Sequence, residues 1–241
     1  MPTIAFSQKW KKQDTLTISD NIYLYKLTDK VWVHVSPISR FTANGMLLIE
    51  KKKAFLFDTP INDSLTELLV GYIQKEMQLT ISGFVTSDWH IDSQGGLGYV
   101  NSLGIPSYGC KITRDTAKSK GLPITSLGFD NSHTIKFGKS TIELYYFGAA
   151  HTHDNILAWI PEEKVLHGSC MIKETSQNNL GFTGDGNTHT YPETVEKVLQ
   201  HFPDAMYVIP GHGKPGGIEL VEHTLKVAQR IAAQKQKTIK P

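Results

Sequence analysis

The chain is 241 residues long, enough for one large domain with a sizeable core. Its 25 Lys and Arg residues nearly balance its 23 Asp and Glu residues, and the formal charge of +2 excludes the strongly basic surface typical of nucleic-acid-binding proteins. The two cysteines, Cys110 and Cys170, exclude a disulfide framework. We therefore expect one domain covering residues 1–241 and no nucleic-acid partner.

The N-terminus, Met-Pro-Thr-Ile-Ala-Phe-Ser-Gln-Lys-Trp, lacks the continuous apolar stretch and the small-residue cleavage site of a signal peptide. No apolar run in the chain approaches the ~20 residues that an α-helix needs to span a bilayer. We therefore expect no membrane partner.

Antiparallel strands dominate the start of the chain. Residues 34–45 predict a hairpin loop, with Pro37 and Asn44-Gly45 as turn formers. The strands expected around this loop cover residues 31–33, 46–50 and 54–57.

Helices and strands then alternate. Apolar residues at helical spacing predict a helix over residues 64–77, with Asp63 or Ser64 as its N-cap. The elements expected next are a strand over 81–85, a helix over 96–103, a strand over 105–110 and a polar helix ending near Lys120.

The second half repeats this order. Its expected strands cover residues 134–137, 141–147, 156–160, 164–167 and 206–209, and its expected helices cover 192–200 and 218–233. Because each half runs from antiparallel strands to a βα unit, we expect an α/β fold in which two sheets pack together with helices outside.

The stretch TSDWHIDSQGG, residues 86–96, follows one of these strands. Asp88, His90 and Asp92 alternate in it with apolar residues, just before Gly95-Gly96. A polar loop would also explain such a run, but open α/β sheets place their sites at the carboxyl ends of strands, and the glycines permit a tight turn into the next helix.

Three further loops after predicted strands carry a metal-competent residue. These are His151 in Gly-Ala-Ala-His-Thr-His-Asp-Asn, Cys170 in His-Gly-Ser-Cys-Met-Ile-Lys, and His212 in Pro-Gly-His-Gly. Together the four loops supply six ligands, which suits two four-coordinate zinc ions with open positions for water. A thiolate mixed with imidazoles and carboxylates fits Zn²⁺ better than Mg²⁺ or Ca²⁺.

This succession of motifs resembles the metallo-β-lactamase fold, and specifically the class B, subclass 1 β-lactamases, from about Val31 to the final helix. Thioesterases and nucleases of that superfamily usually carry His directly after the last Asp of the first motif and Asp in place of the Cys. Here Ser93 follows Asp92, and Cys170 is present. This pairing is the most specific signal in the sequence.

The resemblance implies an αββα sandwich of two mixed β-sheets and a role for each motif residue. Asp88, His90 and His151 would hold the first zinc ion, and Asp92, Cys170 and His212 the second. Asp92 would also orient the attacking hydroxide, and Lys173 would bind the carboxylate of the β-lactam. A flap over residues 36–44 would cover the substrate with an apolar tip at Ile38 and Phe41.

Three positions depart from the family pattern. Asp88 stands where this subclass has His, and Ser93 stands where many relatives carry a buried Arg, so the site is more negative and its first zinc should be a weaker Lewis acid. Phe182 stands where many members have an Asn that contacts the substrate carbonyl. Asn178 or Asn179 would have to substitute for it.

The remaining candidates have plainer interpretations. His153 occupies a variable position of its motif and is not expected to bind metal, and His167 either orients a ligand or simply ends a strand. Cys110 is expected to be a small buried apolar residue. Asp58 and Asn155 are expected to be buried hydrogen-bonding supports of the loops. The histidines expected at the surface or at helix caps are His34, His133, His189, His201 and His223.

The function implied is zinc-dependent hydrolysis of the β-lactam amide of penicillins, cephalosporins and carbapenems by a metal-bound hydroxide, giving antibiotic resistance. Family members are usually monomeric and work in the bacterial periplasm, which sets the expectation for this chain. Two alternatives stay open: another hydrolase of the same fold, cleaving a thioester or lactone, and a zinc-binding protein with little catalysis.

Overall fold

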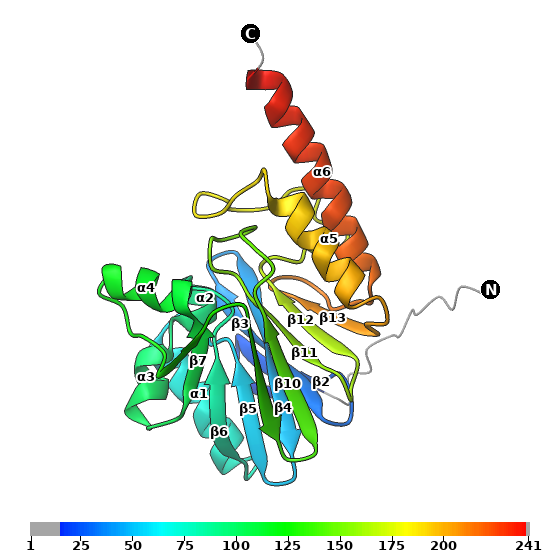
Figure 1. Ribbon diagram of the computed structural model, residues 1–241. Helices are drawn as coiled ribbons and strands as arrows, with labels where there is room; N and C mark the ends of the chain where they lie inside the picture. The colour runs from blue at the N-terminus through cyan, green and yellow to red at the C-terminus, as the bar shows by residue number, and fades with distance from the viewer. Residues whose placement is uncertain (1–14, 240–241) are drawn as a thin grey trace, which may run out of the picture.

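A computed structural model of the chain describes residues 15–239. Two mixed β-sheets pack face to face, and helices cover both outer faces (Figure 1). The expected αββα sandwich is therefore confirmed. Residues 1–14, in which the sequence indicates no signal peptide, lie outside the described part of the chain.

The larger sheet has eight strands in sequence order, β1 to β8. Its first five strands pair antiparallel, and β5 to β8 pair parallel. The strands are β1 (Thr15–Ser19), β2 (Ile22–Lys26), β3 (Val31–Ile38), β4 (Phe41–Glu50), β5 (Lys53–Phe57), β6 (Thr80–Val85), β7 (Ser107–Cys110) and β8 (Leu127–Phe129).

The smaller sheet has five strands in the order β13-β12-β11-β10-β9. Only β12 and β13 pair parallel. The strands are β9 (Ser132–Phe137), β10 (Ser140–Tyr145), β11 (Leu157–Ile160), β12 (Val165–Ser169) and β13 (Tyr207–Pro210).

The helices bury their apolar faces on the outer sides of the sheets. Residues of α1 (Asp63–Lys75) and α3 (Leu97–Ser102) share an apolar cluster with the larger sheet. Residues of α5 (Tyr191–His201) and α6 (Glu219–Ile239) share another with the smaller sheet. The remaining helices are α2 (Ile91–Gln94) and α4 (Lys111–Ser119). None of the helices in residues 15–239 is long and apolar enough to cross a membrane.

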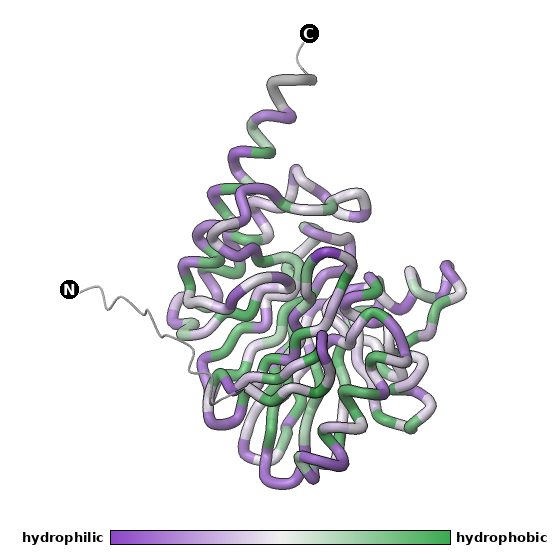
Figure 2. The backbone as a smooth tube through the Cα atoms, turned by 180° about the vertical axis from the view of Figure 1, so that it is seen from behind, coloured by the Kyte–Doolittle hydropathy of each residue, from purple (hydrophilic) through white to green (hydrophobic). Residues whose placement is uncertain are grey.

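The main core lies between the two sheets. Val33 and Phe57 from the larger sheet are fully buried against Ile142 and Ile209 from the smaller one. Figure 2 shows apolar residues along the strands and hydrophilic residues at many of the connecting turns. This core fixes how far apart the sheets stand, and therefore how their loops meet.

The prediction of a loop over residues 34–45 is wrong. Strands β3 and β4 pair from Val31 to Ile38, and only Ser39 and Arg40 form the turn. Gly45 lies inside β4. This position requires glycine because a Cβ there would stand 2.0 Å from Nε2 of His34, which packs across it. The glycine that suggested a turn makes room for a buried histidine.

Two glycine substitutions should therefore change stability in opposite directions. Gly45→Ala should lower the free energy of unfolding by about 2 kcal/mol, because the new methyl group meets the His34 ring and, at 2.5 Å, the carbonyl oxygen of Phe57. Gly71→Ala, within α1 and with no heavy atom within 4 Å of the added Cβ, should raise it by about 0.5–1 kcal/mol. Urea unfolding of the metal-free proteins measures both. Shifts of the same sign would contradict this account.

Candidate metal centre

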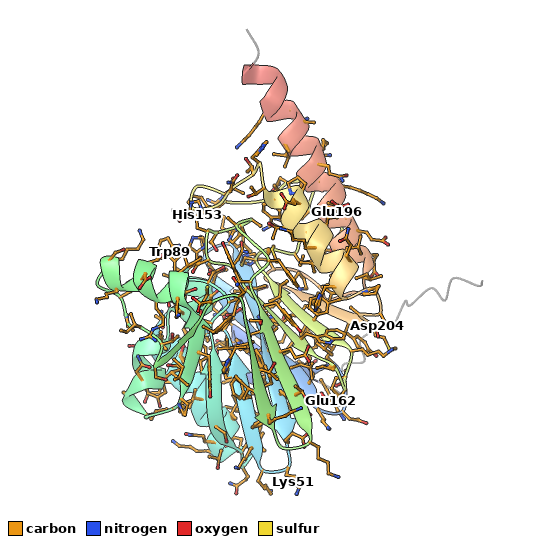
Figure 3. The ribbon with its side chains drawn as sticks, in the orientation of Figure 1. Lys51, Trp89, His153, Glu162, Glu196 and Asp204 are labelled. Carbon is orange, nitrogen blue, oxygen red and sulfur yellow. The ribbon has the colours of Figure 1, made fainter. Side chains whose placement is uncertain are left out.

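Four loops meet at one end of the sandwich. They follow β6, β10, β12 and β13, and their potential ligand atoms form two groups. In Figure 3, Trp89 and His153 lie at this end, and Lys51 and Glu162 lie at the opposite one. The strand ends therefore bring together side chains that are far apart in the sequence.

The six residues expected as ligands divide into two groups of three. Within each group, one ligand atom per residue lies within 4.8 Å of the others. The first group is Asp88, His90 and His151, and the second is Asp92, Cys170 and His212.

The second group is built around Cys170. Its Sγ lies 3.5 Å from both Oδ2 of Asp92 and Nε2 of His212. His212 donates from Nδ1 to the carbonyl oxygen of Thr42 at 2.8 Å, which leaves the Nε2 lone pair facing the other two ligands. The three side chains are already arranged to share one cation.

The first group is oriented by hydrogen bonds from outside it. Nε2 of His90 donates to Oδ2 of Asp185 at 3.0 Å, which leaves Nδ1 of the ring for a metal. Asp88 accepts from the backbone N–H of His90 through Oδ1 at 2.9 Å. His151 is buried, and its Nδ1 has no hydrogen-bond partner.

Burial shifts the proton equilibria of this centre. Desolvation, reinforced by the Asp154 carboxylate, raises the pKa of Asp88 to about 8. Desolvation and the nearby Asp92 carboxylate raise the pKa of the Cys170 thiol well above its usual value. Desolvation lowers the pKa of His151, so this ring is neutral. A cation that binds here must displace protons from Asp88 and Cys170.

The donor set fits a divalent metal. Three imidazoles, two carboxylates and a thiolate provide both soft and hard donors, and each group leaves coordination positions open. The unpartnered Nδ1 of buried His151 is the kind of polar atom that otherwise costs free energy. These six residues are therefore the candidate ligands for a divalent metal.

The carboxylate of Asp58 lies beneath both groups and is 1 % exposed. It accepts hydrogen bonds from the backbone N–H and hydroxyl of Ser87, from the hydroxyl of Ser169 and from Nε2 of His167, at 2.7–3.2 Å. The Ser87 hydroxyl also contacts that of Ser93 at 3.0 Å. Because these serines are adjacent to Asp88, Asp92 and Cys170, the network of one carboxylate joins the two loops, after β6 and β12, that carry these three ligands.

The backbone at this network is strained. Asp58 has a φ of 56° and Ser169 a φ of 44°, in the left-handed region that residues with a side chain rarely occupy. Both residues belong to the hydrogen-bond network, which over-determines their conformation. The strain is therefore held in place by the contacts that position the ligands.

The β3–β4 hairpin is joined to the loop that carries His212. The side-chain amide of Asn44 donates to the carbonyl oxygens of Pro210 at 2.9 Å and Gly213 at 2.8 Å. The backbone N–H of Asn44 donates to the Gly211 carbonyl at 2.8 Å. Strand β4 of the hairpin and the ligand loop are thus held together.

A cleft of about 570 Å³ opens above the two groups. Ile38 and Phe41, the expected flap residues, line it, as does Lys173. Lys173 is buried, and its Nζ donates to the Cys170 carbonyl at 2.6 Å. Asn179 is not among the lining residues; its Oδ1 accepts from the N–H of Gly181 at 2.9 Å and shapes the loop instead.

The structure gives the positions of three further histidines. His34 is buried, contrary to expectation, and contacts the carbonyl oxygens of Phe57 and Asp58 at 3.1 and 3.2 Å. His167 supports the ligand loops through Asp58. His153 is exposed and belongs to neither group. Sequence periodicity does not reveal such buried histidines.

The expected supporting roles of Asp58 and Asn155 are confirmed, as is the burial of Cys110. Asn155 accepts through Oδ1 from the N–H groups of Ala150 and Thr152 and donates to the Gly148 carbonyl. It thereby shapes the loop that presents His151.

Sequence reasoning missed Asp185. It lies in a loop between β12 and α5 and reaches His90 from a segment far along the chain. Its only sequence signal is its place in Thr-Gly-Asp-Gly, a run that indicates a turn but no partner.

The chain is similar to known proteins in both sequence and fold. The chain is 40% identical over 223 residues, covering 90% of each chain, to metallo-β-lactamase type 2 of Bacteroides fragilis. It is 30% identical over 219 residues to metallo-β-lactamase type 2 of Bacillus cereus, covering 89% of this chain and 84% of that one. No protein-family profile matches it.

Solved structures agree. A metallo-β-lactamase from Pontibacter korlensis superposes with a TM-score of 0.83 at 29% identity, covering 86% of this chain and 99% of that one. The DIM-1 metallo-β-lactamase superposes with a TM-score of 0.83 at 31% identity, covering 88% and 98%.

Asp58→Asn should loosen the ligand loops. An amide NH₂ in place of one carboxylate oxygen would face donors, so the free energy of unfolding should fall by about 3 kcal/mol, and metal content should fall with it. Denaturant unfolding and metal analysis measure these changes. Asp130→Asn, which removes an exposed ion pair with Lys111, is the control and should cost less than about 1 kcal/mol. Equal effects of the two substitutions would contradict the role given to Asp58.

The raised pKa of Asp88 predicts a pH dependence of the metal-free protein. Its carboxyl titrates near 8 in the folded state and near ~3.9 in the unfolded chain. The resulting contribution to stability is complete below about pH 4 and is lost as the pH rises to about 8. Relative to Asp88→Asn, which does not titrate, the unmodified protein should therefore lose stability across this window. Urea titrations at a series of pH values test this, and a constant difference would disprove it.

Proposed function

The chain belongs to the metallo-β-lactamase family, a family of hydrolases that act on β-lactams, and we propose that it does so with two bound zinc ions. The observation that supports zinc most directly is the pair of three-residue groups, one of which contains a buried cysteine. Thiolate and imidazole donors favour Zn²⁺ over the harder Mg²⁺ and Ca²⁺. Asp88, His90 and His151 would hold one ion, and Asp92, Cys170 and His212 the other.

When bound, such a pair of ions supplies a Lewis acid for the amide carbonyl and a nucleophile generated from water at neutral pH. The residues of the chain do the positioning. Asp185 and the Thr42 carbonyl orient the rings of His90 and His212, and the Asp58 network fixes the segments of Asp92 and Cys170. We assign Asp92 the further role of orienting the attacking group.

Lys173 is proposed to pair with the carboxylate that β-lactams carry next to the scissile ring. Lys173 lines the cleft, and its Nζ donates one hydrogen bond to the Cys170 carbonyl, so two N–H donors remain for the substrate. The ammonium is compact, and this contact mainly sets the orientation of the substrate over the metal centre.

Asp88 would lower the net positive charge of the first group with its metal bound. A carboxylate in place of a neutral imidazole adds one negative charge to the ligand set, and Ser93 beneath it is uncharged. A zinc ion held by the first group would therefore polarise a substrate carbonyl less strongly than one held by three imidazoles. We propose that the enzyme retains hydrolysis of penicillins, cephalosporins and carbapenems at rates set by this weaker group.

We further propose that the protein acts as a monomer in the bacterial periplasm and that its activity gives antibiotic resistance. Turnover of nitrocefin and imipenem with added zinc, compared with an acyl-thioester substrate and a chelated control, tests the proposed reaction. Thioester turnover alone would point to another hydrolase of this fold. Zinc binding without turnover of either would overturn the proposed catalysis.

Cys170→Ser should remove the second metal. The hydroxyl is a poorer zinc ligand than a thiolate, so we expect one zinc ion fewer per chain and a loss of imipenem hydrolysis beyond the roughly 10–100-fold typical of losing an outer hydrogen-bond partner of a metal ligand. Cys110→Ser is the matched control, because Cys110 is equally buried but lies outside both ligand groups. Zinc analysis and imipenem kinetics decide, and full activity with two zinc ions in Cys170→Ser would disprove the assignment.

A further inference from the structure

Three strongly exposed apolar side chains surround the cleft above the metal centre. Phe182 is 63 % exposed, Phe41 62 % and Ile91 56 %, the highest values among the large apolar residues of the described chain. All three line this cleft, although they come from separate segments. Exposed apolar groups gathered around a concave site mark a surface that binds an apolar ligand group.

Each aromatic ring stands next to one ligand group. The Phe182 ring centroid lies 5.8 Å from that of His90 in the first group, and the Phe41 ring centroid lies 5.8 Å from that of His212 in the second. A substrate whose reacting amide is over the metal centre would therefore have an aromatic ring on either side of it.

The loop of residues 178–185 is built to present the Phe182 ring. Gly181 has a φ of 66°, and Asn179 fixes the turn through its bond to the Gly181 N–H. A Cβ at Gly184 would stand 2.6 Å from Cζ of Phe182, so the ring folds back over this glycine. The position of the ring thus depends on a neighbour that has no side chain.

Most of the polar side chains that line the cleft contact other groups of the protein. His90, His151, Asp92 and His212 belong to the ligand groups, Asp185 accepts from His90, and Lys173 contacts the Cys170 carbonyl. Gln177 is a further polar residue of the lining, so mainly apolar contacts are expected for a substituent that extends toward Phe182, Phe41 and Ile91.

We propose that Phe182, together with Phe41 and Ile91, selects β-lactams that carry an aromatic or other apolar acyl side chain. This inference rests on the proposed function and names the substrate class of the same site. Phe182 stands where the family pattern has an amide that contacts the substrate carbonyl, so the chain exchanges a polar contact for ring packing. Packing of this kind strengthens ground-state and transition-state binding alike, and it changes KM more than kcat.

Two penicillins with the same ring system test the proposal on the zinc-loaded enzyme. Benzylpenicillin carries a phenylacetyl side chain, and 6-aminopenicillanic acid carries none. Phe182→Ala should raise KM for benzylpenicillin about tenfold and leave its kcat within about twofold, with no such change for 6-aminopenicillanic acid. Calorimetry of the hydrolysed product, benzylpenicilloate, should show the same tenfold weakening, independently of turnover.

Three further variants separate ring packing from a general effect of substitution. Gly184→Ala displaces the ring and should reproduce part of the Phe182→Ala effect, whereas Phe182→Tyr keeps the ring and should retain the original KM. Met206→Ala removes a side chain that is 48 % exposed and outside the cleft, and it should change nothing.

Equal changes in KM for both penicillins, or none for benzylpenicillin in Phe182→Ala, would overturn the proposal. An unmodified enzyme that hydrolyses neither penicillin while it binds zinc would instead overturn the proposed function.

Discussion

The buried carboxylate of Asp58 is the contact on which the geometry of the centre depends. Burying a carboxylate costs free energy unless its oxygens are hydrogen-bonded, and Ser87, Ser169 and His167 provide these hydrogen bonds. Few arrangements of the loops satisfy all of these donors at once. The network therefore selects one arrangement, and the ligands adjacent to its serines adopt their positions as a result.

Neither sheet carries a complete ligand group. The loop after β6 belongs to the larger sheet and supplies Asp88, His90 and Asp92, whereas the loops of the smaller sheet supply His151, Cys170 and His212. Each group therefore exists only because the two sheets pack at a fixed distance through their shared core. A substitution in that core acts on ligand spacing even when it lies far from the centre.

The sequence predicted which residues follow the strands better than it predicted the long-range contacts of side chains. His90, Asp92, Cys170 and His212 follow predicted strands, so the rule that sites form at strand ends placed them on one edge. The predictions for His34 and Gly45 were wrong. Asn44-Gly45 is a dipeptide typical of turns, but here the glycine makes room for the buried His34 ring on the neighbouring strand. Asp185 is a long-range contact, and no local pattern reports such contacts.

Asn44 and Thr42 give the β3–β4 hairpin an uneven stiffness. Their bonds to the His212 loop hold β4 close to its start, so the part of the hairpin left free to bend is the short segment around the turn at Ser39 and Arg40. Phe41 sits at this boundary. A bulky molecule that displaces the tip would therefore leave the imidazole of His212 in its place.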